Sequence, residues 1–340
     1  MQASTQTNVA SPLARRGPTG ILLMDYGVPD RVEDVEAYLR VHGHGGDPHP
    51  RDVAYLRHRY KCIWGGSPPC NFSREIERAL AIELAQRYGD RYRLALGARY
   101  WQPFIADTMA QFQRAGLSRV LCVPIFPHAS WMETRAYARA VFKANEQLDP
   151  PLVVDFIASW HALPEYIATF ARNVRAALAE FPAEEQNQVV GIFTAHSLPQ
   201  PAHKHSDPYE EQLLQTSEEV VGQARLRRWR FAFLNTKEKG VWLEPDIVDS
   251  LHTLHVHGVR HVLFVPIGSP YDEPEVLYEV DVVATDVARA LGMTARRAAL
   301  PNADPDFISG LARLIHAHAS SFDGPNTHAN AIALSMLNDQ

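Results

Sequence analysis

Two pairs of segments in this chain nearly repeat, and they constrain the fold more than any other feature of the sequence. The segments at 115–127 (AGLSRVLCVPIFP) and 257–270 (HGVRHVLFVPIGSP) share an apolar run that leads into Val-Pro-Ile. The segments at 20–29 (GILLMDYGVP) and 191–199 (GIFTAHSLP) share an apolar run, a short polar tip and a proline. Because the two copies of each pair lie a domain's length apart, the repeat predicts two related halves.

Short β-branched runs alternate along the chain with longer stretches that have helical spacing. The runs lie at 21–24, 119–125, 152–158, 189–193 and 261–268, and helical stretches lie at 74–89 and 164–181. This alternation is typical of parallel sheets wrapped by helices. We therefore predict an α/β fold of two similar doubly wound, Rossmann-like lobes, each a parallel sheet flanked by helices, with a cleft between them.

The composition changes toward both ends of the chain and suggests four parts. We expect a disordered N-terminus at 1–19, an N-terminal lobe at 20–160, a C-terminal lobe at 161–320 and a flexible tail at 321–340. The first nineteen residues lack the apolar stretch of a secretory signal, although their acid-poor composition leaves a short transit peptide open.

Charge and cysteine content exclude several classes of protein. A net charge of −6 offers no broad positive field, so nucleic acid is not an expected partner. No run approaches the roughly eighteen apolar residues of a transmembrane segment, while peripheral membrane contact through the lips of the cleft stays open. The three cysteines have no CxxC spacing, which fits a reducing, cytoplasmic location. A monomer is the default expectation.

Ligands of doubly wound sheets bind beyond the carboxyl ends of the strands, and histidine and tyrosine side chains occupy such positions here. Tyr26, His128 and His196 each stand close after the end of an apolar run, at a predicted strand end. A predicted helix after the last repeat carries Glu275 and Glu279 one turn apart. An imidazole that faces a carboxylate across the cleft can exchange protons and hold a divalent cation transiently. The plainer alternative for the two acids is a solvated helix face.

Several familiar catalytic motifs are missing from the sequence. It contains no HExxH and no paired cysteines, which argues against a tightly held zinc ion. No GxGxxG, GxxxxGK[ST] or GxSxG follows a predicted strand, so dinucleotide binding, a phosphate loop and a hydrolase nucleophile lose support.

An ordered set of motifs nevertheless resembles the ferrochelatase family, whose members insert ferrous iron into a porphyrin. The motifs are LLMDYGVP, GGSPP, PFIADTM, VPIFPHAS, TAHSLPQ, DPYEEQL, VWLEPD, VPIGSPYDEPEVLYEVD and LPNADPDF, in family order between residues 20 and 318. The resemblance implies a porphyrin held between the lobes, with His196 on one wall and Glu275 on the opposite wall. Tyr26 is similar to the tyrosine of coproporphyrin-type members, which favours coproporphyrin III over protoporphyrin IX.

The same resemblance implies roles for individual residues. His196 and Glu275 are the expected catalytic residues, with His196 neutral near pH 7 and activity weakening below about pH 6. Expected metal contacts come from His196, Glu275, Glu279 and Tyr26. Expected substrate contacts come from Tyr26, Met24, Ile63, Trp64, Ser67, His128, Ser130 and Lys237, although Met24 also suits an ordinary core.

Ferrous iron is expected as a substrate, with no tightly bound cofactor. Some ferrochelatases bind an iron–sulfur cluster through cysteines that include a C-terminal group, and this chain has no cysteine beyond Cys122. We therefore expect no cluster.

Three departures from the family pattern keep other functions open. The chain reads LNTKEKGV at 234–241, where members usually carry Gln-Ser-Arg, and HGHGGDPHP at 42–50, where coproporphyrin-type members present arginine. Val283 stands where a third acid is common. The alternatives are a ferrochelatase-like protein redirected to another small-molecule or metal chemistry, and a non-catalytic porphyrin- or haem-binding protein.

Overall fold

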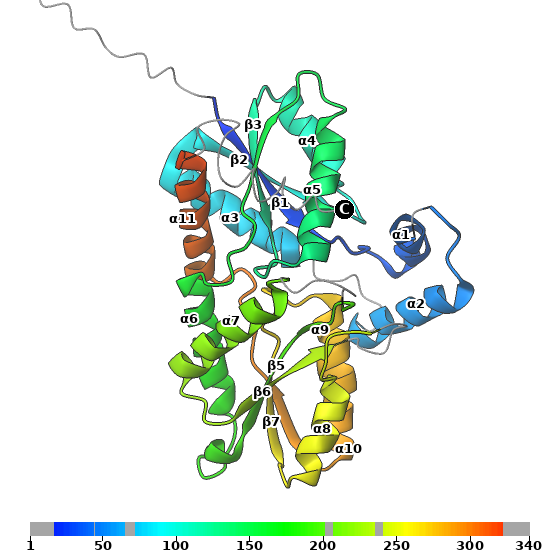
Figure 1. Cartoon of the computed structure of the whole chain (residues 1–340), viewed down its shortest axis with the longest axis vertical. Helices are drawn as coiled ribbons and strands as arrows, with labels where there is room; N and C mark the ends of the chain where they lie inside the picture. Colours follow the sequence, from blue (N-terminus) through cyan, green and yellow to red (C-terminus); the bar gives the residue numbers. More distant parts are fainter. Residues whose placement is uncertain (1–16, 44, 65–71, 201–206, 235–240, 322–340) are drawn as a thin grey trace, which may run out of the picture.

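Two parallel sheets, stacked along the long axis of the molecule, form the framework of this chain (Figure 1). The computed structural model describes residues 17–43, 45–64, 72–200, 207–234 and 241–321. The first sheet has the strand order β2-β1-β3-β4, and the second has the order β6-β5-β7-β8. Equivalent strands therefore occupy equivalent places in the two sheets, and the predicted α/β class with two similar lobes is confirmed.

The N-terminal sheet is formed by β1 (Thr19–Asp25), β2 (Tyr92–Ala98), β3 (Arg119–Pro124) and β4 (Val153–Phe156). Its helices are α1 (Val35–His42), α2 (Pro50–Trp64), α3 (Phe72–Tyr88), α4 (Ile105–Arg114) and α5 (Trp131–Asn145), with 3-10 turns η1 (Val32–Asp34) and η2 (Gly89–Arg91). Helices α1 and α2 stand away from this sheet, and α2 reaches the C-terminal lobe, where it contacts α9 (Pro274–Tyr278) (Figure 1).

The C-terminal sheet is formed by β5 (Val190–His196), β6 (Trp229–Leu234), β7 (His261–Val265) and β8 (Thr294–Arg297). Its helices are α6 (Pro164–Leu178), α7 (Tyr209–Ala224), α8 (Ile247–Val256), α9 and α10 (Thr285–Ala290), with the 3-10 turn η3 (Gln186–Gln188). A π-helix, η4 (Glu279–Ala284), continues α9 and leads into α10. Helix α11 (Pro305–Ser321) ends the described part.

The sequence repeat corresponds to matching strands. β3 and β7 carry the first repeated pair, β1 and β5 carry the second, and each of these four strands lies between two neighbours. Three strands were not predicted. β2 carries Arg93 and Gly97 among its apolar residues, β6 places Arg230 beside Trp229, and β8 is a short edge strand rich in arginine. None of the three contains the valine or isoleucine that marks the predicted runs.

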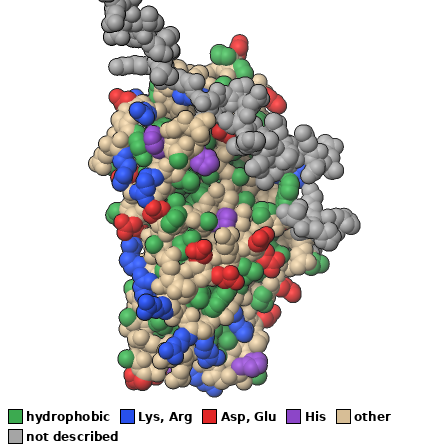
Figure 2. Space-filling view, turned by 60° about the vertical axis from the view of Figure 1, so that its left-hand side comes forward, with side chains coloured by type: hydrophobic (Ala, Val, Ile, Leu, Met, Phe, Trp, Pro, Cys, Tyr) green, Lys and Arg blue, Asp and Glu red, His purple; other side chains and the backbone are tan. Residues whose placement is uncertain are grey.

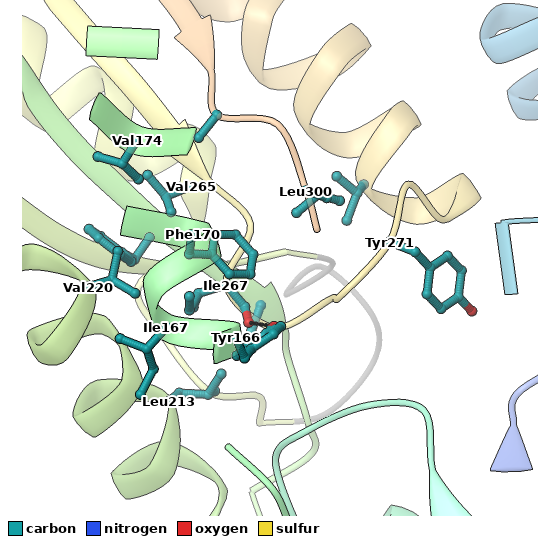
Figure 3. Close-up of a cluster of buried hydrophobic side chains, with 14 of the residues drawn as sticks. Tyr166, Ile167, Phe170, Val174, Leu213, Val220, Val265, Ile267, Tyr271 and Leu300 are labelled. Atoms are coloured by element: carbon teal, nitrogen blue, oxygen red, sulfur yellow. Dashed lines mark hydrogen bonds between the residues drawn. The ribbon is translucent and has the colours of Figure 1, made fainter. Parts of the chain in front are cut away.

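The apolar core of the C-terminal lobe forms where α6 and α7 pack against β7 and the segment after it. Tyr166, Phe170 and Val174 of α6 project at helical spacing toward Val265 and Ile267, as Figure 3 shows. The hydroxyl of Tyr166 donates a hydrogen bond of 2.8 Å to the backbone oxygen of Ile267. This bond holds the start of the segment that leads to α9.

Helix α11 links the two halves of the structure. It packs against α6 and also against α3, the helix that flanks the N-terminal sheet (Figure 1). The hydroxyl of Tyr92, at the start of β2, lies 2.7 Å from His316 Nδ1 of α11. The predicted lobe boundary near residue 160 stays a prediction, because the last helix contacts both lobes.

The surface and the helix lengths bear on possible partners. Acidic and basic side chains are both present across the face in Figure 2, between apolar side chains. Within the described ranges, no helix combines the length and apolar character that crossing a membrane requires.

Candidate active site

A pocket of about 1080 Å³ lies between the carboxyl ends of the two sheets. Its N-terminal wall includes Tyr26 and Tyr100, which follow β1 and β2. Its C-terminal wall includes His196, Glu273 and Glu275. The volume lies at the upper end of the range for small-molecule pockets, so a large flat ligand can be accommodated. This is the edge of the sheets at which the sequence predicted a ligand site.

His196 and Glu275 are hydrogen-bonded neighbours in this pocket. His196 Nδ1 lies 2.6 Å from Glu275 Oε1. His196 is the last residue of β5, and Glu275 lies in the first turn of α9, where Pro274 is the first helical residue. Both residues therefore belong to the C-terminal lobe. The prediction that they face one another from opposite walls is wrong, because the loop after β7 returns α9 to the tip of β5.

A glycine allows this close return. A Cβ atom at Gly268 would lie 2.5 Å from Ala195 Cβ and 2.9 Å from Ala195 Cα. Only glycine permits the backbone of the loop to lie so close to the strand that ends at His196. The contact brings the beginning of α9, and with it Glu275, to the imidazole.

The environment of His196 favours its charged form. Burial lowers the pKa of His196, but the carboxylate of Glu275 outweighs burial and raises this pKa to about 9. The expectation of a neutral His196 near pH 7 is therefore wrong for the unliganded pocket. The imidazole and Glu275 form an ion pair at neutral pH, and a metal ion must displace the proton to bind.

Glu273 is a site residue that the sequence analysis did not identify as one. Burial and the neighbouring carboxylate of Glu275 raise the pKa of Glu273 to about 8. The side chain lines the same pocket as His196. Two groups with pKa values of about 9 and about 8 thus share one wall, which suits proton transfer between them.

Tyr26 lies on the N-terminal wall at a sharp turn. The following residue, Gly27, has a φ of +85°, and a Cβ there would lie 2.7 Å from Ala98 Cβ. The Tyr26 hydroxyl lies 2.7 Å from His42 Nε2 at the end of α1. Burial raises the pKa of Tyr26, so its phenol is neutral. A metal contact from Tyr26 stays a prediction.

Four other predicted residues line the pocket, namely Met24, Ile63, His128 and Ser130. Met24 also belongs to the N-terminal core and is 2% exposed. Ser130 has a structural task as well, because its hydroxyl accepts the backbone N–H of Glu133 at the start of α5.

His128 is buried with one nitrogen satisfied and one without a partner. Its Nε2 lies 3.1 Å from Thr216 Oγ1 of α7, and its Nδ1 has no hydrogen-bond partner among the described residues. Burial, with the nearby His161, lowers the pKa of His128 to about 3, so the ring is neutral.

Glu279 forms an ion pair with Arg59. Its carboxylate lies 3.3 Å from Arg59 Nη2 of α2, and both side chains are largely buried. It is not among the described residues that line the pocket, and the π-helical turn begins at this residue. Among the described residues, no group of three or more His, Cys, Asp or Glu side chains is arranged to hold a metal ion. A metal contact from Glu279 stays a prediction.

Three predicted substrate contacts cannot be placed. Ser67 and Lys237 lie outside the described residues, and nothing is described of the Trp64 side chain. The departure at 234–241 likewise falls mostly outside the described part.

The sequence analysis also missed two pocket residues that follow β2. Arg99 Nη1 lies 2.6 Å from Glu133 Oε2. The guanidinium carbon of Arg99 lies 4.7 Å from the centroid of the Tyr100 ring. Both residues line the pocket. The strand-end rule that found Tyr26 would have found them, had β2 been recognised as a strand.

The two-lobed fold is similar to that of solved chelatase structures. The structure of SirB from Bacillus subtilis with Fe3+ matches with a TM-score of 0.55 at 10% identity, covering 91% of this chain and 100% of that chain. A second structure, the sirohydrochlorin chelatase SirB from Bacillus subtilis subspecies spizizenii in complex with cobalt, matches with a TM-score of 0.50 at 10% identity, covering 89% of this chain and 96% of that chain. These likenesses concern the fold alone.

Sequence comparisons identify the family. The family model described as Ferrochelatase matches residues 18–319. A ferrochelatase from Herpetosiphon aurantiacus is 34% identical over 299 residues, covering 87% of this chain and 98% of that protein. A coproporphyrin III ferrochelatase from Oceanobacillus iheyensis is 31% identical over 308 residues, covering 89% of this chain and 97% of that protein. This chain belongs to the ferrochelatase family of enzymes.

Proposed function

We propose that this chain inserts ferrous iron into a porphyrin, with coproporphyrin III as the preferred substrate. The observation that carries the proposal is the 2.6 Å contact between His196 and Glu275 in a pocket of about 1080 Å³ between the lobes. The relatives named ferrochelatase and coproporphyrin III ferrochelatase support the same reaction.

The chemistry requires removal of protons from the porphyrin. As Fe²⁺ enters, the two pyrrolic N–H bonds break, the nitrogen electron pairs bind the metal, and two protons leave. His196 Nδ1 is engaged by Glu275, so Nε2 is the ring nitrogen left to receive a proton or to contact the metal. The positive charge of the arriving iron disfavours the imidazolium, which releases its proton as the metal approaches.

Glu273 completes a route for the released protons. Its pKa of about 8 and the pKa of His196 of about 9 lie close together. Transfer between groups of similar pKa costs little free energy, so protons can pass along this wall toward solvent. Binding of the macrocycle in the pocket bends the ring and exposes its nitrogen lone pairs, which lowers the barrier to metal entry.

Coproporphyrin III differs from protoporphyrin IX by carrying propionates where the latter carries vinyl groups. Polar side chains on the N-terminal wall suit such carboxylates. Tyr26 and His42 offer a phenol and an imidazole, and Arg99 contributes a guanidinium. These groups support coproporphyrin III as substrate.

The proposed enzyme works without a tightly bound cofactor or an iron–sulfur cluster, and iron is its substrate. In the described part of the chain, the free cysteines are the exposed Cys62 and the buried Cys122. We propose that it acts as a monomer in the cytoplasm.

Anaerobic mixing of the protein with Fe²⁺ and either porphyrin tests the proposal. Metallation changes the Soret and Q bands, and we expect a higher kcat/KM with coproporphyrin III than with protoporphyrin IX. Equal values would remove the substrate preference. Porphyrin binding without metallation would favour a binding protein, and no binding of either ring would favour a redirected enzyme.

A further inference from the structure

A buried hydrogen bond joins the segment before α9 to the end of β1 in the other lobe. The hydroxyl of Tyr271, in the segment between β7 and α9, donates to Asp25 Oδ1 over 2.9 Å. Asp25 is the last residue of β1 in the N-terminal sheet. The two residues are 3% and 6% exposed, so water does not compete for this bond. Figure 3 shows Tyr271 directed away from the core cluster around Phe170.

Asp25 is firmly held on its own side. Its Oδ1 also accepts the backbone N–H of Tyr26 over 2.8 Å, and its carboxylate accepts the hydroxyl of Ser73 in α3. The next residue along the chain, Tyr26, is part of the N-terminal wall. The position of Asp25 therefore fixes the position of that wall.

Tyr271 is equally bound to the segment that carries the two pocket acids. Its backbone oxygen accepts the hydroxyl of Ser269 and the N–H of Glu273, each over 2.8 Å. Its ring packs against the ring of Phe126 of the N-terminal lobe, with 5.7 Å between the ring centroids. Glu275 follows only four residues after Tyr271. A shift of Tyr271 would therefore move Glu275 relative to His196.

We propose that Asp25 and Tyr271 are positioning residues, whose hydrogen bond across the lobes holds Glu275 against His196 and sets the separation of the two pocket walls. The inference rests on the proposed function for its effect on catalysis. Neither residue need touch the porphyrin or the metal, because both act through the loop that carries the acids.

The expected effect is on turnover more than on substrate binding. A displacement of about 1 Å at a reacting group can lower a rate about 100-fold. We therefore expect Tyr271→Phe and Asp25→Ala to lower kcat at least about tenfold and to change KM by less than about threefold. Asp25→Asn keeps an oxygen acceptor and should retain kcat within about threefold of the unmodified enzyme.

A double-mutant cycle distinguishes this role from a loss of general stability. The double variant Asp25→Ala, Tyr271→Phe should be no slower than Asp25→Ala alone, because the bond between the two residues is already lost in that single variant. Tyr166→Phe is the matched control, since it removes a buried tyrosine hydroxyl bond from the same segment without crossing between the lobes. We expect it to lower Tm but to leave kcat within about threefold.

A readout independent of turnover separates this inference from the proposed function. The pKa of His196, followed by NMR, should fall from about 9 toward its ordinary value in Tyr271→Phe, because Glu275 moves away. If the unmodified protein fails to metallate porphyrin but this fall occurs, the positioning role holds and the proposed function is wrong. An unchanged His196 pKa, multiplicative single effects, or an Asp25→Asn variant as slow as Asp25→Ala would overturn the positioning role.

Discussion

His196 and Glu275 lie 2.6 Å apart within one lobe. The hydrogen bond between Tyr271 and Asp25 instead joins the two lobes, as other contacts such as the Arg59–Glu279 ion pair also do. This division separates two tasks. The first pair supplies acid–base and metal-binding groups, and the second pair fixes the wall that carries Glu275. The consequences can be tested one at a time.

The pH dependence of the reaction should follow His196. Its pKa is raised to about 9, so the imidazole is charged at lower pH, and kcat/KM should increase as pH rises toward 9. Glu275→Gln removes the carboxylate that raises this pKa, so the increase should occur at lower pH, with a maximum at least about tenfold below that of the unmodified enzyme. Rate measurements between about pH 6 and about pH 10 cover the ordinary pKa of histidine and the raised pKa of His196, and they give both midpoints. Identical midpoints would contradict the pairing.

Acid should destabilise the fold through His128. Its pKa is lowered to about 3 in the folded state, while the unfolded chain has the ordinary value near 6.5. Between these values the unfolded state binds more protons, so stability rises with pH and is lost as pH falls. Each additional proton that the unfolded state binds lowers the free energy of unfolding by about 1.4 kcal/mol for every unit by which the pH falls. Urea unfolding should show a shallower pH dependence for His128→Gln, and the exposed His257→Gln should behave as the unmodified protein. Parallel curves for all three would refute this assignment.

The ion pair between Arg59 and Glu279 should hold α2 against the C-terminal lobe. Arg59→Ala leaves a largely buried carboxylate without this partner and should lower the free energy of unfolding by about 1–3 kcal/mol. Adding Glu279→Gln should restore part of that loss. Arg57→Ala is the matched control, because its contact with Glu36 is exposed and 3.8 Å long, and we expect a change below about 0.5 kcal/mol. If Arg57→Ala and Arg59→Ala lowered the free energy of unfolding equally, the buried ion pair would contribute no more to stability than the exposed one.

The close approach at Gly268 should be intolerant of a side chain. Gly268→Ala introduces a Cβ that meets Ala195 at 2.5 Å, which should cost about 1–3 kcal/mol of stability and separate α9 from His196. Gly222→Ala in α7 meets nothing within 4 Å and should be neutral or stabilising by up to about 1 kcal/mol. Thermal unfolding and kcat measured on both variants check this. A Gly268→Ala variant with unmodified Tm and kcat would exclude the packing argument.

The framework of the fold follows from sequence patterns, whereas the contacts within the site do not. The runs that became β1, β3, β5 and β7 are apolar because these strands have neighbours on both sides. Edge strands β2 and β8 carry arginine and remain hidden from such patterns. With β2 unrecognised, Arg99 and Tyr100 could not be placed at the pocket.

The pairing inside the site depended on the path of one loop. The repeat correctly indicated that strand tips carry Tyr26 and His196, but it gave no information on the direction in which the segment after β7 returns. That path depends on Gly268 and on the Tyr271 hydrogen bond, which are visible only in three dimensions. The same holds for Glu273, whose raised pKa arises from burial beside Glu275.

The most direct test of the account is the initial rate of iron insertion into coproporphyrin III by the unmodified chain and by His196→Ala, measured anaerobically beside porphyrin binding, with His257→Ala as control. We expect His196→Ala to lose at least about 100-fold in rate while it still binds porphyrin, and His257→Ala to retain full rate. A His196→Ala variant that metallates porphyrin at the unmodified rate would contradict the central role of the His196–Glu275 pair.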